Sequence, residues 1–132
     1  MRLLFAAFGI LLALCEARAQ DVTINLDRVA RAAYCAGYEK ALENFVSHDT
    51  VTLCNSPHAN PSLCSSTRAV LFSIQKLRRR LSAYVLSITS VSDAAIMTAS
   101  TAITTGQHDF ASCISGNDCH SLKIRCDQVL PY

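Results

Sequence analysis

The chain has 132 residues, a formal net charge of +2 and a hydrophobic fraction of 51%. This length accommodates one domain with a modest core. The near balance of charge excludes a global field that would gather nucleic acid or a membrane surface, so no nucleic-acid partner is expected.

Residues 1–19 have the order of a secretory signal peptide. Arg2 precedes an unbroken apolar run over residues 3–15. Ala17-Arg18-Ala19 then places small residues at the two positions that a signal peptidase reads. The apolar run is shorter than the ~20 residues needed to cross a hydrocarbon core, so it predicts a cleaved leader rather than a transmembrane helix.

A lipid anchor at Cys15 is the alternative, which would tether the protein to a membrane. A lipoprotein signal requires a small residue just before the cysteine, and Leu14 is not small. We therefore expect cleavage after Ala19, no transmembrane segment, and a single helical, cysteine-rich domain over residues 20–132. That domain would carry ten Lys plus Arg against nine Asp plus Glu.

The cysteine content indicates an exported protein held by disulfides. Seven cysteines become six once Cys15 is removed, namely Cys35, Cys54, Cys64, Cys113, Cys119 and Cys126. An even number in a short exported chain is typical of a disulfide framework, and such bonds persist outside the cytosol. The sequence thus predicts a periplasmic or secreted protein.

Residues 24–49 form the first predicted helix. Tyr34, Tyr38, Leu42 and Phe45 recur at three- and four-residue spacing and define one apolar stripe. Asn25 or Asp21 is a candidate N-cap, and the helix is expected to end near residues 47–50. Gly37 within it either weakens the helix or allows a close neighbour.

A second helix is predicted to begin at Asn60-Pro61, an N-cap followed by proline at the first helical position. Its apolar seam steps in fours and threes and consists of Val70, Ile74, Leu77, Leu81, Tyr84 and Ile88. Ser92 indicates the N-cap of a third helix that Gly106 would stop. One continuous helix over residues 61–105 is the alternative, since no Pro or Gly interrupts that range.

These elements predict an all-α fold, a small three-helix up-down-up bundle with a disulfide-stapled irregular C-terminal tail. Cys54 and Cys64 flank the same loop and are expected to pair. A third helix that stops partway along the bundle would bring Cys113 to Cys35, leaving Cys119 to pair with Cys126. Six cysteines allow fifteen connectivities, so this pairing is one hypothesis among many.

The tail segment CISGNDCHSLKIRC raises the alternative of a metal or haem protein. Five and six residues intervene between its successive cysteines, whereas two to four usually intervene between structural zinc ligands. Covalent haem attachment requires C-x-x-C-H, and Cys119-His120 completes only the end of that motif. His48, His58 and His108 are better explained as polar residues at helix ends. We therefore expect no metal and no cofactor.

The chain contains no recognised catalytic arrangement. Ser73 to Lys76 matches S-x-x-K, but the S-D-N and K-T-G motifs that such enzymes also need do not occur. Paired cysteines supply no free nucleophilic thiol. The sequence therefore favours a protein that is not an enzyme.

Arg78, Arg79 and Arg80 form the best candidate contact surface, because arginines form forked hydrogen bonds with acidic groups. The leading functional hypothesis is a small exported binding protein, for example of inhibitor or immunity type, whose protein partner is unknown. The alternative is a carrier that encloses a small apolar ligand between the stripes of the first and second helices.

Overall fold

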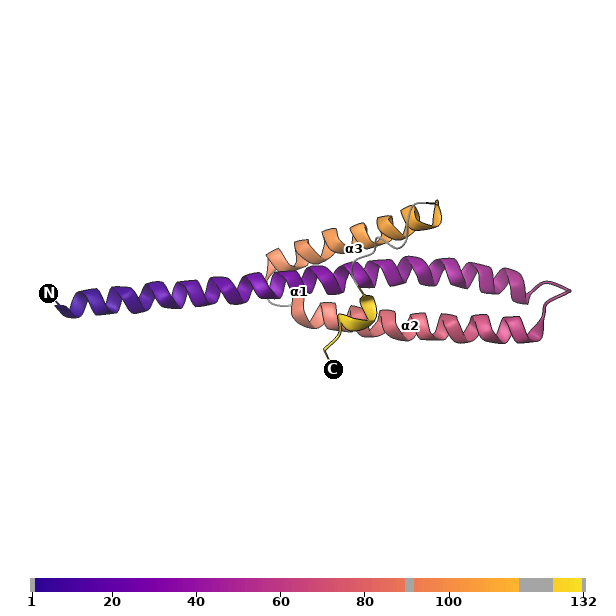
Figure 1. Cartoon of the computed structure of the whole chain (residues 1–132), viewed down its shortest axis with the longest axis horizontal. Coiled ribbons are helices and arrows are strands. Elements are labelled where there is room, and N and C mark those ends of the chain that lie inside the picture. Colours follow the sequence, from indigo (N-terminus) through magenta and orange to yellow (C-terminus); the bar gives the residue numbers. More distant parts are fainter. Residues whose placement is uncertain (1, 90–91, 117–124, 132) are drawn as a thin grey trace.

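Three helices make up the core of the protein (Figure 1). The computed structural model describes residues 2–89, 92–116 and 125–131, with side chains from Leu26 onward. Its elements are α1 (Arg2–Cys54), α2 (Pro61–Thr89), α3 (Asp93–Ile114) and the short 3₁₀ helix η2 (Cys126–Gln128). No strand occurs among these described residues, and the predicted all-α, up-down-up fold is confirmed.

Helix α1 is central, because α2 and α3 each pack extensively against it and only slightly against each other. It is much longer than the predicted range 24–49. Its backbone is helical through both candidate N-caps, Asp21 and Asn25, and continues to Cys54, since no proline interrupts residues 2–54. Within the described part of the chain, no helix is both long enough and apolar enough to cross a bilayer.

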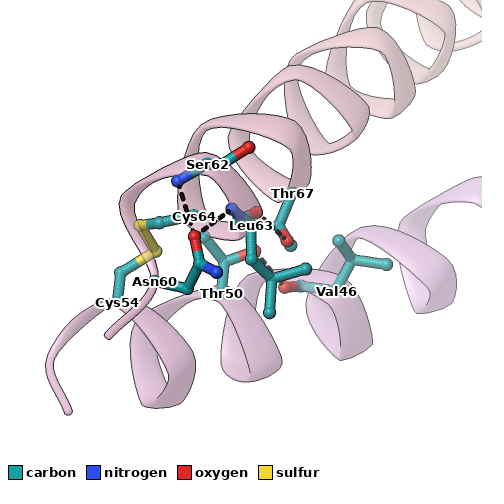
Figure 2. Close-up of a disulfide and its surroundings, with 8 residues drawn as sticks. All are labelled: Val46, Thr50, Cys54, Asn60, Ser62, Leu63, Cys64 and Thr67. Atoms are coloured by element: carbon teal, nitrogen blue, oxygen red, sulfur yellow. Dashed lines mark hydrogen bonds between the residues drawn. A yellow bond between two sulfur atoms is a disulfide. The ribbon is translucent and has the colours of Figure 1, made fainter. Parts of the chain in front are cut away.

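Helix α2 begins as the sequence predicts. The Asn60 Oδ1 atom accepts hydrogen bonds from the backbone N–H groups of Ser62 and Leu63, which caps the helix at Pro61 (Figure 2). Most of the predicted seam faces the core: Ile74 and Leu81 are buried, and Leu77, Tyr84 and Ile88 pack against the buried cluster. Val70 is the exception and is exposed.

Helix α3 is a separate helix, so the continuous helix over residues 61–105 is excluded. Ser92 adopts an extended conformation, and its hydroxyl accepts a hydrogen bond from the Ala95 N–H at 3.2 Å. The predicted end at Gly106 is wrong, because the helix continues for eight residues to Ile114. Gly106 is buried between helices rather than placed at a helix end.

The two helical glycines allow α1 and α3 to approach closely. A Cβ atom at Gly37 would collide with the backbone carbonyl of Ile103. A Cβ atom at Gly106 would collide with the carbonyl oxygen of Tyr34 and lie 3.0 Å from the backbone nitrogen of Tyr38. Each glycine therefore provides the space that the opposite backbone fills.

The bond between Cys54 and Cys64 closes the α1–α2 turn, with a Cα–Cα distance of 5.4 Å (Figure 2). The predicted partners of Cys35 and Cys126 are wrong, because these two cysteines bond to each other, also at 5.4 Å between Cα atoms. Cys113 is disulfide-bonded as well, and Cys119 lies outside the described residues.

The extra length of α3 explains why Cys113 does not reach Cys35. The ring of Phe110 contacts that of Phe45, ten residues beyond Cys35 in α1. Gly106 lies beside Tyr34, and Cys113 is seven residues further along α3, so Cys113 lies about 10 Å past the level of Cys35 along the helix axis. Cys126 of η2 reaches Cys35 instead. Val129 and Leu130, which follow η2, pack against the buried core that contains Cys35.

The close approach of α1 and α3 predicts that alanine will destabilise the protein at two glycine positions, although alanine usually stabilises a helix. Alanine stabilises an unconstrained helix interior by up to ~1 kcal/mol relative to glycine. At Gly37 and Gly106 the added methyl group meets backbone, so Gly37→Ala and Gly106→Ala should each destabilise the protein by about 1–3 kcal/mol. Urea unfolding measures this, with Ala83→Gly on the exposed side of α2 as a propensity control. Greater stability of either alanine variant would contradict the close packing.

Candidate functional site

The side of α2 that faces away from α1 carries two large exposed apolar residues. Phe72 is 67% exposed and Leu86 is 71% exposed. They are two heptads apart, so they lie on one stripe about 21 Å long. An α-helix turns about 100° per residue around its axis. In that projection three exposed cations, Arg68, Lys76 and Arg79, lie with Phe72 and Leu86 inside an arc of about 80°. These five residues define the α2 outer face.

The predicted arginine cluster is divided between two roles. Arg78 forms an ion pair with Glu43 of α1, and both side chains are largely buried. Arg79 and Arg80 are exposed, and no ion pair of theirs occurs in the part of the chain that the structure describes. Arg78 therefore joins α2 to α1, while Arg79 lies on the α2 outer face and Arg80 flanks it.

Charge is segregated between the helices. Helix α2 contains five cations and no acidic residue. These cations are Arg68, Lys76, Arg78, Arg79 and Arg80. Helix α2 has no acidic residue, so the acidic residues that make the whole chain nearly neutral lie elsewhere. The α2 outer face is therefore locally positive. It is chemically suited to an anionic surface that also offers apolar contacts.

A second apolar region lies at the end of the α1–α2 hairpin. Helix α3 stops short of this end, so no third helix covers it (Figure 1). Leu53, Leu63 and Val70 are exposed there, close to the Cys54–Cys64 bond. Thr50 is buried between the two helices, and its hydroxyl donates to the Val46 carbonyl at 2.7 Å (Figure 2).

A polar cluster connects α1 to α3 on the other side of the bundle. The Tyr34 hydroxyl donates a hydrogen bond to Asp109 Oδ2 at 2.9 Å. Burial raises the pKa of Tyr34 well above its ordinary value, and the bond to Asp109 raises it further because that bond requires the phenol proton. Tyr38 packs edge-on against Phe110, and burial raises its pKa too. Both phenols stay protonated and structural near neutral pH.

The candidate histidines do not assemble a metal site in the described residues. His48 and His58 are exposed at the hairpin end. His108 lies on α3, with Nδ1 3.7 Å from Asp109 Oδ1. No group of three metal-ligating side chains occurs within the residues described, and His120 lies outside them.

A shallow depression on α3 is lined by short hydroxyl-bearing side chains and one histidine. These residues are Ser100, Thr101, Thr104, Thr105 and His108. The hydroxyls of Thr104 and Thr105 donate to backbone carbonyls one turn earlier, so they are already satisfied within the helix. None of its lining residues belongs to the two stripes that would enclose an apolar ligand.

The sequence predictions missed two features of the structure. Phe72 and Leu86 repeat at the same seven-residue period as the core seam, on the opposite side of the helix, and a helical projection of residues 61–89 would have identified them. Glu39 continues the three- and four-residue spacing of the buried residues Val29, Ala32 and Ala36, so the helical period also indicates its burial.

Comparisons of the chain with protein-family models, with curated proteins and with solved structures found no match.

Glu39 provides a test of the core around α1. It is only 8% exposed, and within the described segments no cation pairs with its carboxylate. Burial raises the pKa of Glu39, so folding favours its protonated form. A raised acid pKa means that this residue destabilises the fold increasingly as pH rises above its ordinary value near 4.5.

We expect Glu39→Gln to raise the free energy of unfolding at pH 7, with a gain that shrinks towards pH 4. Urea unfolding at both pH values measures the difference. Asp49→Asn, at an exposed position of the same helix, is the control and should show no comparable gain. If Glu39→Gln raised the free energy of unfolding less at pH 7 than at pH 4, this result would contradict the burial of a charge.

Proposed function

We propose that the protein is exported to a periplasm or to the cell exterior and is processed after Ala19. Two observations support this. The N-terminal residues have the order of a signal peptide. Cys35, Cys54, Cys64, Cys113 and Cys126 are all disulfide-bonded, which suits an oxidising compartment.

Export predicts a specific mature form. Protein recovered from its native compartment should begin at Gln20 and should contain no titratable thiol. Intact mass measurement with and without a thiol-alkylating reagent tests both expectations. Material that retains Met1 and reacts at several cysteines would contradict export.

We further propose that the mature domain is a binding protein rather than an enzyme, and that it contacts a partner protein through the α2 outer face. The observation that carries this proposal is the exposure of Phe72 and Leu86 among exposed cations on a helix whose other side already forms the core. Neither residue is needed to bury α2 against α1. Aromatic and arginine side chains supply much of the binding energy at protein interfaces, which makes this surface the strongest candidate.

Such a protein would act by occupying or shielding an acidic surface of its partner. Inhibitor and immunity proteins work in this way, through a rigid scaffold that presents a few anchoring side chains. The disulfides and the close α1–α3 contact support rigidity, because they limit the conformational entropy lost on binding.

Site-specific cross-linking tests this function. A photoreactive amino acid at position 72 should form an adduct with a protein in the native compartment, whereas the same group at exposed position 101 on α3 should not. Arg79→Glu combined with Arg80→Glu should reduce the adduct at position 72 by about tenfold or more, as loss of charge complementarity predicts. Equal adducts at both positions, or none at position 72, would contradict the proposal.

A further inference from the structure

We infer that the α2 outer face binds an acidic amphipathic helix of the partner, which lies along α2 with its apolar residues on Phe72 and Leu86. Its carboxylates pair with the cations between and beside these two residues. This inference rests on the proposed function and adds the chemical class of the partner segment.

The shape of the face favours a helix as its occupant. Phe72, Arg79 and Leu86 follow one another at seven-residue intervals, so the surface is a straight stripe rather than a pocket. A helix with apolar residues at the same period can follow the stripe over its length of ~21 Å. The backbone of α2 is hydrogen-bonded within the helix and offers no edge to an extended strand.

The charge of the face selects acidic residues. Arg68, Lys76 and Arg79 are exposed, and α2 holds no carboxylate that could compete with a partner for them. Arginine presents a planar fork that matches the two oxygens of a carboxylate. Glutamates that flank an apolar stripe on the partner would therefore lie opposite these cations.

The same surface is poorly suited to a lipid bilayer. Helices that lie in a membrane interface separate an apolar face from a charged face, so that each meets its own layer. On α2, Arg79 lies on the line between Phe72 and Leu86, and Lys76 lies beside it. Insertion of the two apolar side chains would draw these cations towards the hydrocarbon, whereas pairing with individual carboxylates accommodates this mixed pattern.

The test uses the full oxidised mature chain and a synthetic probe. The probe is a helical peptide of about three heptads with leucines at the apolar positions and glutamates beside them. A matched peptide carries lysine in place of each glutamate. Vesicles of anionic and of zwitterionic phospholipid form the lipid arm. Fluorescence anisotropy of labelled peptide and vesicle cosedimentation measure binding at low and at physiological salt.

We expect the glutamate peptide to bind and the lysine peptide to bind at least about tenfold more weakly. Salt should reduce this difference in affinity. The variant Arg79→Glu/Arg80→Glu should remove most of this preference, because Arg68 and Lys76 then only offset the two new carboxylates. The control Arg28→Glu/Lys40→Glu carries the same change of charge on exposed positions of α1 and should bind the glutamate peptide within about twofold of wild type. Phe72→Ser should weaken binding without altering the charge preference. Unfolding curves establish that each variant is folded.

Equal binding of the two peptides, or an equal loss in the α1 control, would overturn the inference. Binding to anionic vesicles with no binding to the glutamate peptide would overturn it in favour of a lipid surface. A protein adduct at position 72 without peptide binding would preserve the proposed function and reject an acidic helix as the partner segment. Peptide binding without any adduct in the native compartment would support the chemistry of the face and reject the proposed function.

Discussion

The contact between the backbones of α1 and α3 is the constraint on which the arrangement of the other elements depends. Gly37 and Gly106 each lack the atom that would otherwise strike the opposite helix. This proximity allows the Tyr34 hydroxyl to reach Asp109 and places Phe110 against the rings of Tyr38 and Phe45. A larger separation would break all three contacts, since hydrogen bonds and ring contacts both weaken steeply with distance.

The central position of α1 also explains why α2 has a free surface. Because α2 and α3 contact α1 from different directions and scarcely meet each other, only one side of α2 is needed for the core. Leu81 and Val85 occupy that side, and Glu43 holds Arg78 at its margin. The opposite side is left to solvent with its apolar and cationic residues. A helix stabilised by one face can vary the other face under selection for binding.

Periodicity and capping chemistry predicted the parts of the fold that depend on neighbours in sequence. The seam from Ile74 to Ile88, the Asn60 cap and the Ser92 cap were all identified from local patterns. The features that depend on distant partners were not. Gly106 was interpreted as a helix stop because a glycine at a helix end and a glycine at a helix crossing are identical in sequence.

The same limitation applies to α1, to the cysteines and to the candidate surface. The predicted aromatic stripe from Tyr34 to Phe45 contacts α3, while the fully buried positions of α1 include small residues such as Ala32 and Ala33. The partner of Cys35 could not be predicted, because it depends on how far α3 extends. The arginine cluster indicated the correct helix, but only a contact from α1 distinguishes Arg78 from its two neighbours.

The bond between Cys35 and Cys126 encloses a loop of 91 residues and so imposes an order on biosynthesis. Cys54 and Cys64 are separated by only ten residues and can meet as soon as both have left the ribosome. Cys35 must wait for Cys126, which follows the whole of α2 and α3 in the chain. During that interval the nascent chain carries a reactive thiol on a helix that has not yet been covered, and a folding catalyst that joined it to an earlier cysteine would trap the wrong topology. The Cys35–Cys126 bond is therefore expected to form after the Cys54–Cys64 bond.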